Sequence, residues 1–222
     1  MNSAERERCV IYTGIYGGYD PLPFVEAPDP SLDYVCFTDA DLATDGVWQI
    51  RRTVPVLADP HRDSRRVKLL PHLFLPEYTI SLWVDGNCTL RPGLTRSLLE
   101  RATRRLPMAL MPHQERGCAY AEAETVLLYG LDDPALVRRQ MYAYRSLGFP
   151  VGYGLHVGNF MVRRHLDPRC RALCELWWKE LCSHSRRDQL SFSFVRWSTR
   201  QEVETLPWSY YDNPFFTWGS DG

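Results

Sequence analysis

The chain has 222 residues, of which 45% are hydrophobic and 24% are charged, and its formal net charge is −1. This composition excludes disordered and fibrous proteins, and a chain of this length buries roughly 70% of its unfolded surface without needing disulfides. The near-neutral charge argues against a general nucleic-acid-binding protein.

Strand and helix signals alternate along the chain, as is typical of α/β proteins. In chain order we expect strands at 9–13, 34–38 and 47–50, then a helix from Pro60 to about 71 capped by Asp59, and a strand at 78–84. A helix at 93–104, a strand at 108–111, helices at 119–128 and from 134, a loop at 148–154 and a strand at 157–162 follow. After helices at 167–181 and 186–197, we expect the aromatic tail from Pro207 to be irregular, either packed over a site or held by a partner.

The hydropathy and the cysteines of the sequence indicate the cellular compartment in which the protein works. No stretch approaches the ~20 apolar residues of a membrane span, and the first ten residues are charged where a signal peptide would be apolar. The seven cysteines are odd in number and include no C-x-x-C pair, so a disulfide framework is not expected. Cys170, Cys174, Cys182 and His184 can be drawn as a zinc set, but we interpret the thiols as buried core groups. We expect a cytoplasmic protein whose membrane contact, if any, is peripheral.

The sequence Asp85-Gly86-Asn87 follows the apolar strand 78–84 and predicts a tight turn. In open α/β sheets, ligands bind at the carboxyl ends of the strands. Two oxygen-bearing side chains two positions apart can share a hard cation such as Mg²⁺ or Mn²⁺. We therefore predict a metal site at Asp85 and Asn87, and the alternative is an ordinary strand turn.

A glycine-rich loop, residues 14–20, follows the first strand. Glycines let backbone amides approach a phosphate, and tyrosines can stack on a base. The G-x-G-x-x-G pattern is absent, so a nicotinamide cofactor is not indicated. The alternative is an ordinary glycine-rich turn.

The helix from Pro60 is densely basic. Arg62 and Arg66 share one face at i,i+4 spacing, and Arg65 and Lys68 share another at i,i+3 spacing. Such a face suits a diphosphate, and the alternative is a solvated basic face.

Polar residues also interrupt two apolar segments. His156 and Asn159 flank Gly158 in the strand 157–162, and buried polar groups of this kind need a partner, which can be a ligand or the protein itself. Asp188 and Gln189 open the last helix, where Asp188 can be a helix cap or an active-site carboxylate.

Seven segments in this order resemble a family of nucleotide-sugar glycosyltransferases of the GT-A type: VIYTGIYGGYD, YVCFTD, SRRVKLLPH, SLWVDGN, MPHQERGCAYAEA, GLHVGNFMVRRH and RRDQLSFSFV. More narrowly, the chain resembles the family labelled domain of unknown function 616, which includes bacterial proteins and plant proteins tied to cell-wall polysaccharides. The resemblance implies one GT-A-like, Rossmann-like α/β domain over 1–222, with a mixed, mostly parallel sheet flanked by helices. It implies a nucleotide-binding half at about 1–90 and an acceptor-side half at about 91–222.

The resemblance also implies roles for individual residues. The catalytic residues would be Asp85, Asp188 and Gln189. The donor-binding residues would be Thr13, Gly14, Tyr16, Gly17, Tyr19, Asp39, Arg62, Arg65, Arg66, Lys68, Trp83, Val84, Asp85, Gly86 and Asn87. The acceptor or sugar side would hold His113, Glu115, Arg116, Tyr120, Glu122, His156, Gly158 and Asn159.

The metal site departs from the family pattern, in which an Asp stands at the position of Asn87. A neutral amide lowers the expected metal affinity. Many GT-A enzymes add a late His as a third ligand, but no His follows His184 here, and Asp212 is a possible substitute. We still expect Mn²⁺ or Mg²⁺ as the cofactor.

The implied reaction moves a sugar from a UDP- or GDP-linked donor to a hydroxyl of a glycan, a polysaccharide or a small secondary metabolite. The Asp-Gln pair resembles that of retaining GT-A families, which implies retention of configuration, whereas inversion would need a carboxylate base such as Glu115, Glu122, Glu124 or Asp188. The alternatives are a metal-dependent nucleotidyltransferase or hydrolase and a non-catalytic nucleotide- or carbohydrate-binding module.

Overall fold

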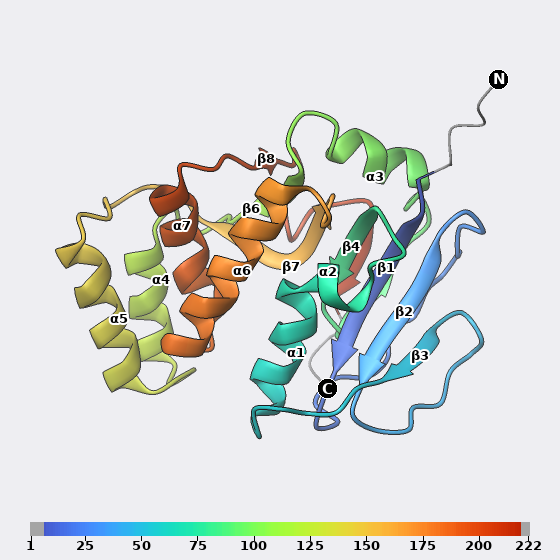
Figure 1. Cartoon of the computed structure of the whole chain (residues 1–222), viewed down its shortest axis with the longest axis horizontal. Coiled ribbons are helices and arrows are strands. Elements are labelled where there is room, and N and C mark those ends of the chain that lie inside the picture. The colour runs from blue at the N-terminus through green and yellow to red at the C-terminus, as the bar shows by residue number, and fades with distance from the viewer. Residues whose placement is uncertain (1–6, 219–222) are drawn as a thin grey trace.

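The structure is a computed structural model that describes residues 7–218 (Figure 1). The strands are β1 (Cys9–Ile15), β2 (Asp33–Thr38), β3 (Gln49–Arg52), β4 (Ile80–Val84), β5 (Cys88–Leu90), β6 (Met108–Pro112), β7 (His156–Arg163), β8 (Glu204–Thr205) and β9 (Phe216–Trp218). The helices are α1 (Pro60–Leu69), α2 (Pro71–Phe74), α3 (Arg96–Ala102), α4 (Ala119–Leu128), α5 (Pro134–Ser146), α6 (Pro168–Ser183) and α7 (Asp188–Thr199). Within residues 7–218, no helix combines the length and apolarity that crossing a bilayer requires.

The described residues form a central seven-stranded sheet with strand order β3-β2-β1-β4-β7-β6-β8. The pairs β3/β2, β2/β1, β1/β4 and β6/β8 are parallel, whereas β7 is antiparallel to both β4 and β6. The sheet is therefore mixed and mostly parallel, and helices flank it, which confirms the predicted fold class.

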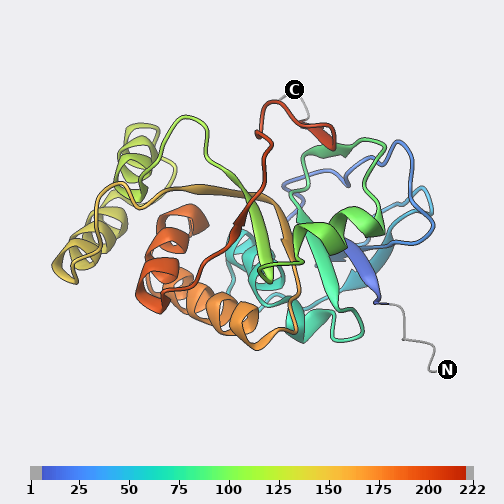
Figure 2. The ribbon, with the colours of Figure 1, turned by 90° about the horizontal axis from the view of Figure 1, so that it is seen from above.

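Alternate side chains of β1 enter two different cores. Val10 and Tyr12 pack in one buried cluster with Trp177 of α6, whereas Ile11 packs in the other with Leu99 of α3. Figure 2 shows α6 along one side of the sheet and the β5–β9 pair along the opposite side. The sheet is thus covered on both faces, as expected for near-continuous apolar strands.

The topology brings three distant segments to one edge of the sheet. β1 and β4 are parallel neighbours, so the loop after β1 and the turn after β4 leave the sheet on the same side. β7 runs antiparallel to β4 with Phe160 opposite Val84, so β7 begins at this edge. The Asp85 N–H donates to the Asn159 carbonyl over 3.1 Å and fixes this junction.

Most predicted elements are present, and the differences have local causes. The third strand begins at Gln49 rather than Val47, because Trp48 is buried against Tyr34 and donates its indole N–H to the Pro23 carbonyl. Asp59 caps α1 and Pro60 occupies its first turn, as predicted.

The short strands β5, β8 and β9 were not predicted. Each has two or three residues, too few for a periodic pattern, and each pairs with a segment distant in sequence. The tail predicted to be irregular therefore includes β9 paired with β5, and Phe215 and Phe216 stack on Phe160 of β7. The described residues of the tail thus pack against the fold.

Candidate active site

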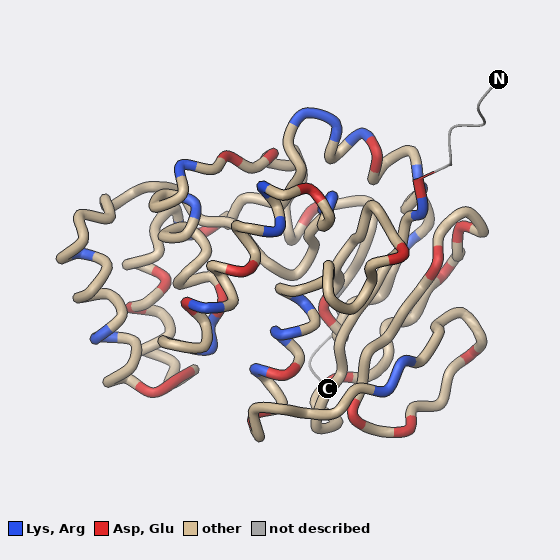
Figure 3. The backbone as a smooth tube through the Cα atoms, viewed as in Figure 1, with Lys and Arg blue, Asp and Glu red and all other residues tan. Residues whose placement is uncertain are grey.

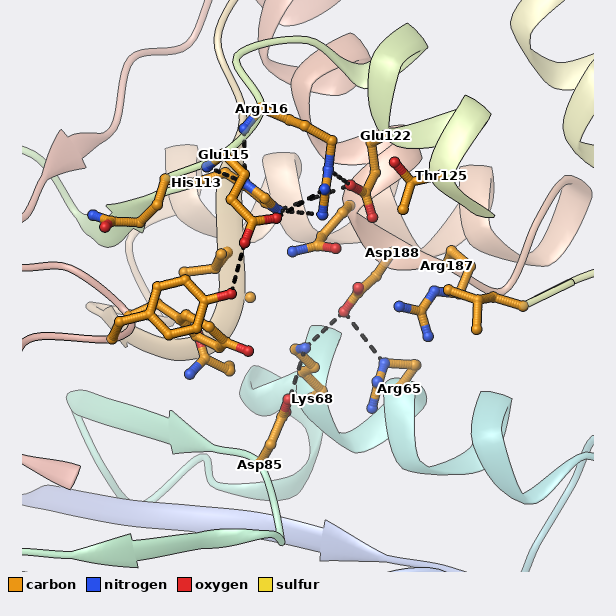
Figure 4. A pocket seen from close by; sticks show the side chains of 18 of the residues that line it. Arg65, Lys68, Asp85, His113, Glu115, Arg116, Glu122, Thr125, Arg187 and Asp188 are labelled. Carbon is orange, nitrogen blue, oxygen red and sulfur yellow. Dashed lines mark hydrogen bonds and ion pairs between the residues drawn. The ribbon is translucent and has the colours of Figure 1, made fainter. Parts of the chain in front are cut away.

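A central cleft of about 290 Å³ lies at the edge where β4 ends and β7 begins. Its floor consists of Lys68 of α1, Asp85 after β4, Gly158 and Asn159 of β7, and Asp188 of α7. Figure 4 shows Asp188 between Lys68 and Arg65, with Asp85 below. This is the edge at which open α/β sheets bind ligands.

The floor is built on a buried ion pair. The Lys68 ammonium lies 2.6 Å from Asp188 Oδ2 and 3.6 Å from Asp85 Oδ1, and only 1% of its side chain is exposed. Burial alone would raise the pKa of the Asp188 carboxyl, but Lys68 and then Arg65 reverse this and hold its pKa well below the usual range. Burial lowers the pKa of Lys68, and Asp188 and Asp85 oppose that shift. Each charge thus faces opposite charges on two sides, which stabilises the ionised form of both groups.

The helix-cap interpretation of Asp188 is wrong. The cap residue of α7 is Arg187, no side chain caps the helix, and the Asp188 carboxylate bonds to Lys68 instead. The positive end of the helix still favours an acid in its first turn.

Gly158 and Trp83 hold the floor in place. A Cβ atom on Gly158 would lie 3.0 Å from Lys68 Nζ and 3.4 Å from Asp188 Oδ2, so any side chain at this position would press on the pair. The Trp83 indole N–H donates to Asp85 Oδ1 over 2.7 Å, and Lys68 Nζ lies 5.5 Å from the centre of the Trp83 ring. Trp83 therefore orients both Asp85 and Lys68.

Asn159 is the polar group of the floor that lacks a partner. Both atoms of its amide are buried and neither makes a hydrogen bond within the described residues. Leaving such a group unsatisfied costs about 1–3 kcal/mol. Its position on the cleft leaves both atoms of the amide available to a ligand.

A side cavity of about 480 Å³ adjoins the central cleft and shares His61, Arg65 and Arg187 with it. Its other walls include Gly14, Tyr16, Tyr19 and Asp20, from the loop after β1. Burial and then Arg65 lower the pKa of His61 to about 4, so its ring is neutral at pH 7, and Arg65, Arg186 and Arg187 carry the positive charge of this cavity.

A small cavity of about 140 Å³ connects this loop with the turn after β4. Asp20, Asp85, Gly86 and Asn87 line it together. Asp20 packs so closely on the turn that a Cβ on Gly86 would lie 2.6 Å from Asp20 Cβ. The turn thus has two carboxylates and one amide around it.

The opposite wall of the central cleft comes from the segment after β6 and from α4 (Figure 4). Arg116 lies 2.5 Å from the buried Glu122 and 3.0 Å from Glu115. His113 Nδ1 accepts the backbone N–H groups of Glu115 and Arg116. Glu115 also accepts a hydrogen bond of 2.9 Å from the Tyr211 hydroxyl, which lowers the pKa of the Glu115 carboxyl.

Several predicted donor residues stay outside the lining of these cavities. Arg62 donates to the Leu181 and His184 carbonyls at the end of α6, and Arg66 stacks on Phe74. The basic helix thus presents the Arg65–Lys68 face to the cleft and uses the Arg62–Arg66 face for packing. Of the four, Arg65 and Lys68 line the central cleft and Arg62 and Arg66 do not, so contact with the donor stays a prediction for Arg65 and Lys68.

Other predicted donor residues support the loop after β1 or lie in the core. Asp39 accepts the Gly17 N–H at 3.1 Å, and Gly17 has φ +64°, which favours glycine. Thr13 and Val84 are fully buried in the sheet and do not line the described cavities.

Two predicted acceptor-side residues and two candidate carboxylates also lie elsewhere. His156 contacts Thr205 and Arg196, and Tyr120 donates to the Phe149 carbonyl, so both are satisfied by the protein itself. Glu124 and Asp212 are exposed and line none of the described cavities. By contrast, Gln189 lines the central cleft as predicted.

Lining residues without a predicted role are Asp20, His61, Ser64, Gln114, Thr125, Gly130, Leu131, Val157, Arg186, Arg187, Tyr210 and Tyr211, together with the cap residues Asp59 and Pro60. Asp20 belongs to the loop 14–20 that the sequence already indicates, His61 lies in the basic helix and Arg187 directly precedes Asp188, so these motifs are the signals for all three. Tyr210 and Tyr211 belong to the aromatic tail, for which packing over a site was one of the two predictions, and both line the central cleft.

Comparison with solved structures defines the fold class. The WbbM bifunctional glycosyltransferase matches with a TM-score of 0.52 and 11% identity, over 93% of this chain and 40% of that one. Mouse xyloside xylosyltransferase 1 matches with a TM-score of 0.48 and 10% identity, over 90% of this chain and 84% of that one. The chain has the α/β fold of a glycosyltransferase.

Sequence comparison then gives the family. The TOD1/MUCI70 glycosyltransferase-like domain matches residues 2–212, and the chain belongs to this family. A relative from Arabidopsis thaliana, "Probable hexosyltransferase MUCI70", is 32% identical over 165 residues, which are 68% of this chain and 28% of the relative. The chain thus spans about 28% of that relative's length. The predicted resemblance to glycosyltransferases is confirmed, and the narrower label, domain of unknown function 616, stays a prediction.

Proposed function

We propose that this domain transfers a hexose from a nucleoside diphosphate sugar to an acceptor hydroxyl. The observation that most directly supports this proposal is the floor of the central cleft, where the Lys68–Asp188 pair, Asp85 and the unsatisfied Asn159 amide converge. Sugar hydroxyls both donate and accept hydrogen bonds, so they match such a mixed set of groups. Membership of a glycosyltransferase-like family and the hexosyltransferase relative support this proposal.

The donor nucleotide, UDP or GDP, would occupy the side cavity. Tyr19 is 87% exposed and offers an aromatic ring to the base, whereas Tyr16 is buried in the wall of the cavity. Arg65 and Arg187 lie where this cavity meets the central cleft. Arginines form short, strong bonds with phosphate, so the diphosphate would lie at that junction. The sugar would then point toward Lys68 and Asp188.

The groups around Gly86 fit a hard divalent cation. Asp85 and Asp20 supply carboxylates and Asn87 supplies an amide oxygen, and Mg²⁺ and Mn²⁺ prefer oxygen ligands. Asp20 thus provides a second negative charge where Asn87 lacks one. A cation held there would offset the charge of the diphosphate.

In this reaction the bond between the anomeric carbon and the diphosphate oxygen breaks, and the acceptor oxygen bonds to that carbon. The bonding electrons leave with the diphosphate, whose charge Arg65, Lys68 and Arg187 would stabilise. The ionised Asp188 would lie beside the positive charge that develops on the sugar. The acceptor's hydroxyl proton would pass to the departing diphosphate.

We favour retention of configuration at the anomeric carbon. Within the described residues, each carboxylate lining the central cleft is already bonded: Asp85 and Asp188 to Lys68, and Glu115 and Glu122 to Arg116. An inverting enzyme needs a carboxylate poised to accept a proton, and these contacts disfavour one. The anomeric configuration of the product, read by NMR, tests this point.

Calorimetry with UDP and GDP, each with Mn²⁺ and then with EDTA, tests donor binding. We expect one nucleotide to bind and Mn²⁺ to tighten it. The variant Asp20→Asn should lose most of the Mn²⁺ effect, whereas Glu124→Gln, an exposed acid outside the described cavities, should keep it. Equal affinity with Mn²⁺ and EDTA would remove the metal from the proposal.

Product analysis with a panel of nucleotide sugars tests the reaction itself. Release of nucleoside diphosphate together with a glycosylated acceptor supports transfer. Release of pyrophosphate would instead indicate a nucleotidyltransferase. Nucleotide binding without any product would indicate a non-catalytic module.

A further inference from the structure

The C-terminal tail runs across the molecule from β8 to β9 (Figure 2), and two of its residues line the central cleft. It leaves β8, beside β6, and reaches β9, beside β5, the strand that follows Asn87. Asn213 Oδ1 accepts the backbone N–H groups of Phe215 and Phe216 at 3.0 and 2.9 Å and so fixes the chain before β9. The stretch 208–213 is therefore anchored at both ends.

Two adjacent tyrosines of this stretch line the cleft. The ring centres of Tyr210 and Tyr211 are 4.3 Å apart, with the planes at 76°. Tyr211 is 63% exposed, so its ring contributes little to the core, and its hydroxyl donates to Glu115. The two rings give the cleft an aromatic wall with a carboxylate beside it.

The charge of this wall favours some ligands over others. Glu115 and Glu122 face a single guanidinium, that of Arg116. Burial and then Arg116 lower the pKa of His113, so its ring adds no positive charge at pH 7. The wall therefore has one excess negative charge, which would repel an anionic ligand.

On the floor beside this wall, one buried side-chain amide lacks hydrogen-bond partners. The buried Asn159 amide needs both a donor and an acceptor, and a hydroxyl supplies both. A pyranose ring has an apolar C–H face as well as a hydroxyl edge. Aromatic rings attract such faces, and amides and carboxylates bind such edges.

We propose that Tyr210, Tyr211 and Glu115 form the acceptor subsite, and that it takes a pyranose ring of a neutral glycoside. The C–H face of the ring lies on the tyrosines, and its hydroxyl edge faces Glu115 and Asn159. The inference rests on the proposed function, since it leaves the Lys68–Asp188 side of the cleft to the donor sugar.

Ligand-observed NMR titrations of the whole chain, with UDP and Mn²⁺ present, test the subsite. The probes are methyl β-glucopyranoside, methyl β-galactopyranoside and the matching methyl glucuronide. We expect a neutral glycoside to bind and Tyr211→Ala to weaken it roughly three- to tenfold, as for the loss of one aromatic contact. Tyr211→Phe keeps the ring and should lose less.

Tyr142→Ala is the matched control, because Tyr142 of α5 is 75% exposed and lies outside the cleft lining. It should leave glycoside binding unchanged. The subsite is wrong if no neutral glycoside binds the wild type, or if Tyr210→Ala and Tyr211→Ala, both still folded by circular dichroism, bind as the wild type does. Tighter binding of the glucuronide than of the neutral glycosides would show that the subsite does not prefer a neutral sugar.

Calorimetry of UDP and GDP on the same variants separates the two proposals. Unchanged nucleotide affinity with weakened glycoside binding supports both. If glycosides bind through the tyrosines but no nucleotide binds the wild type, the subsite stands and the proposed transfer fails.

Discussion

The floor and the wall of the central cleft pair carboxylates with cations in similar ways, but they differ in burial. The side chains of Lys68 and Asp188 are 1% and 10% exposed, whereas those of Arg116 and Glu115 are 25% and 53% exposed. A buried charge depends on its partner because little water can replace it, while solvent screens an exposed pair. A change in the floor should therefore affect both the stability of the fold and the reaction. A change in the exposed part of the wall should affect substrate specificity with little effect on stability.

The largest effect should follow from Asp188→Asn, which breaks the floor. Lys68 then keeps only Asp85 at 3.6 Å, and losing one partner of a buried pair costs about 3–5 kcal/mol of unfolding free energy. We also expect kcat to fall while donor affinity changes little. Denaturant unfolding and steady-state kinetics measure the two effects.

The double variant Lys68→Met/Asp188→Leu removes both charges and serves as the control. Apolar replacements of a buried pair are often neutral in stability, so this variant should recover most of the lost stability without recovering activity. Wild-type stability and activity in Asp188→Asn would mean that the pair has neither role.

The Lys68–Asp188 ion pair should also make the free energy of unfolding depend on pH. The folded-state pKa of Asp188 lies below the unfolded value of about 3.9, so its stabilisation is complete above that value and is lost as the pH falls through the folded value. The stability difference between wild type and Asp188→Asn should therefore be constant from pH 7 to 5 and shrink below about pH 4. Urea unfolding at each pH measures it, and a difference that grows on acidification would contradict the ion pair.

A smaller effect should come from Gly158→Ala. The new Cβ would lie 3.0 Å from Lys68 Nζ, so the ammonium must move by a few tenths of an ångström. Overpacking of this kind costs about 1–3 kcal/mol, and we expect kcat to fall with it. Gly117→Ala, where a Cβ meets open space, should match the wild type in both measurements.

The smallest effect on the fold should come from Glu115→Gln in the exposed wall. We expect an unchanged melting temperature, because solvent replaces the contacts of this side chain. The acceptor KM should rise while donor affinity stays constant. A large loss of thermal stability would show that the wall is as structural as the floor.

Much of the fold was predictable because it depends on local chemistry. The Asp59-Pro60 cap, the turn after β4 and the strand carrying Gly158 and Asn159 all lie where the residue types indicate. The strands β5, β8 and β9 were not predictable, since their pairing partners come from distant parts of the chain.

The sequence by itself determined the α/β class and the candidate residues Asp85, Asn159 and Asp188. It also showed that Arg65 and Lys68 share one helix face and Arg62 and Arg66 another. Only the tertiary structure decided which face meets the cleft, because helix periodicity fixes relative but not absolute orientation. It likewise placed Lys68 beside Asp188, 120 positions away, and Tyr211 beside Glu115, 96 positions away. Contacts over such separations depend on how the sheet orders its strands, and no local pattern encodes that order.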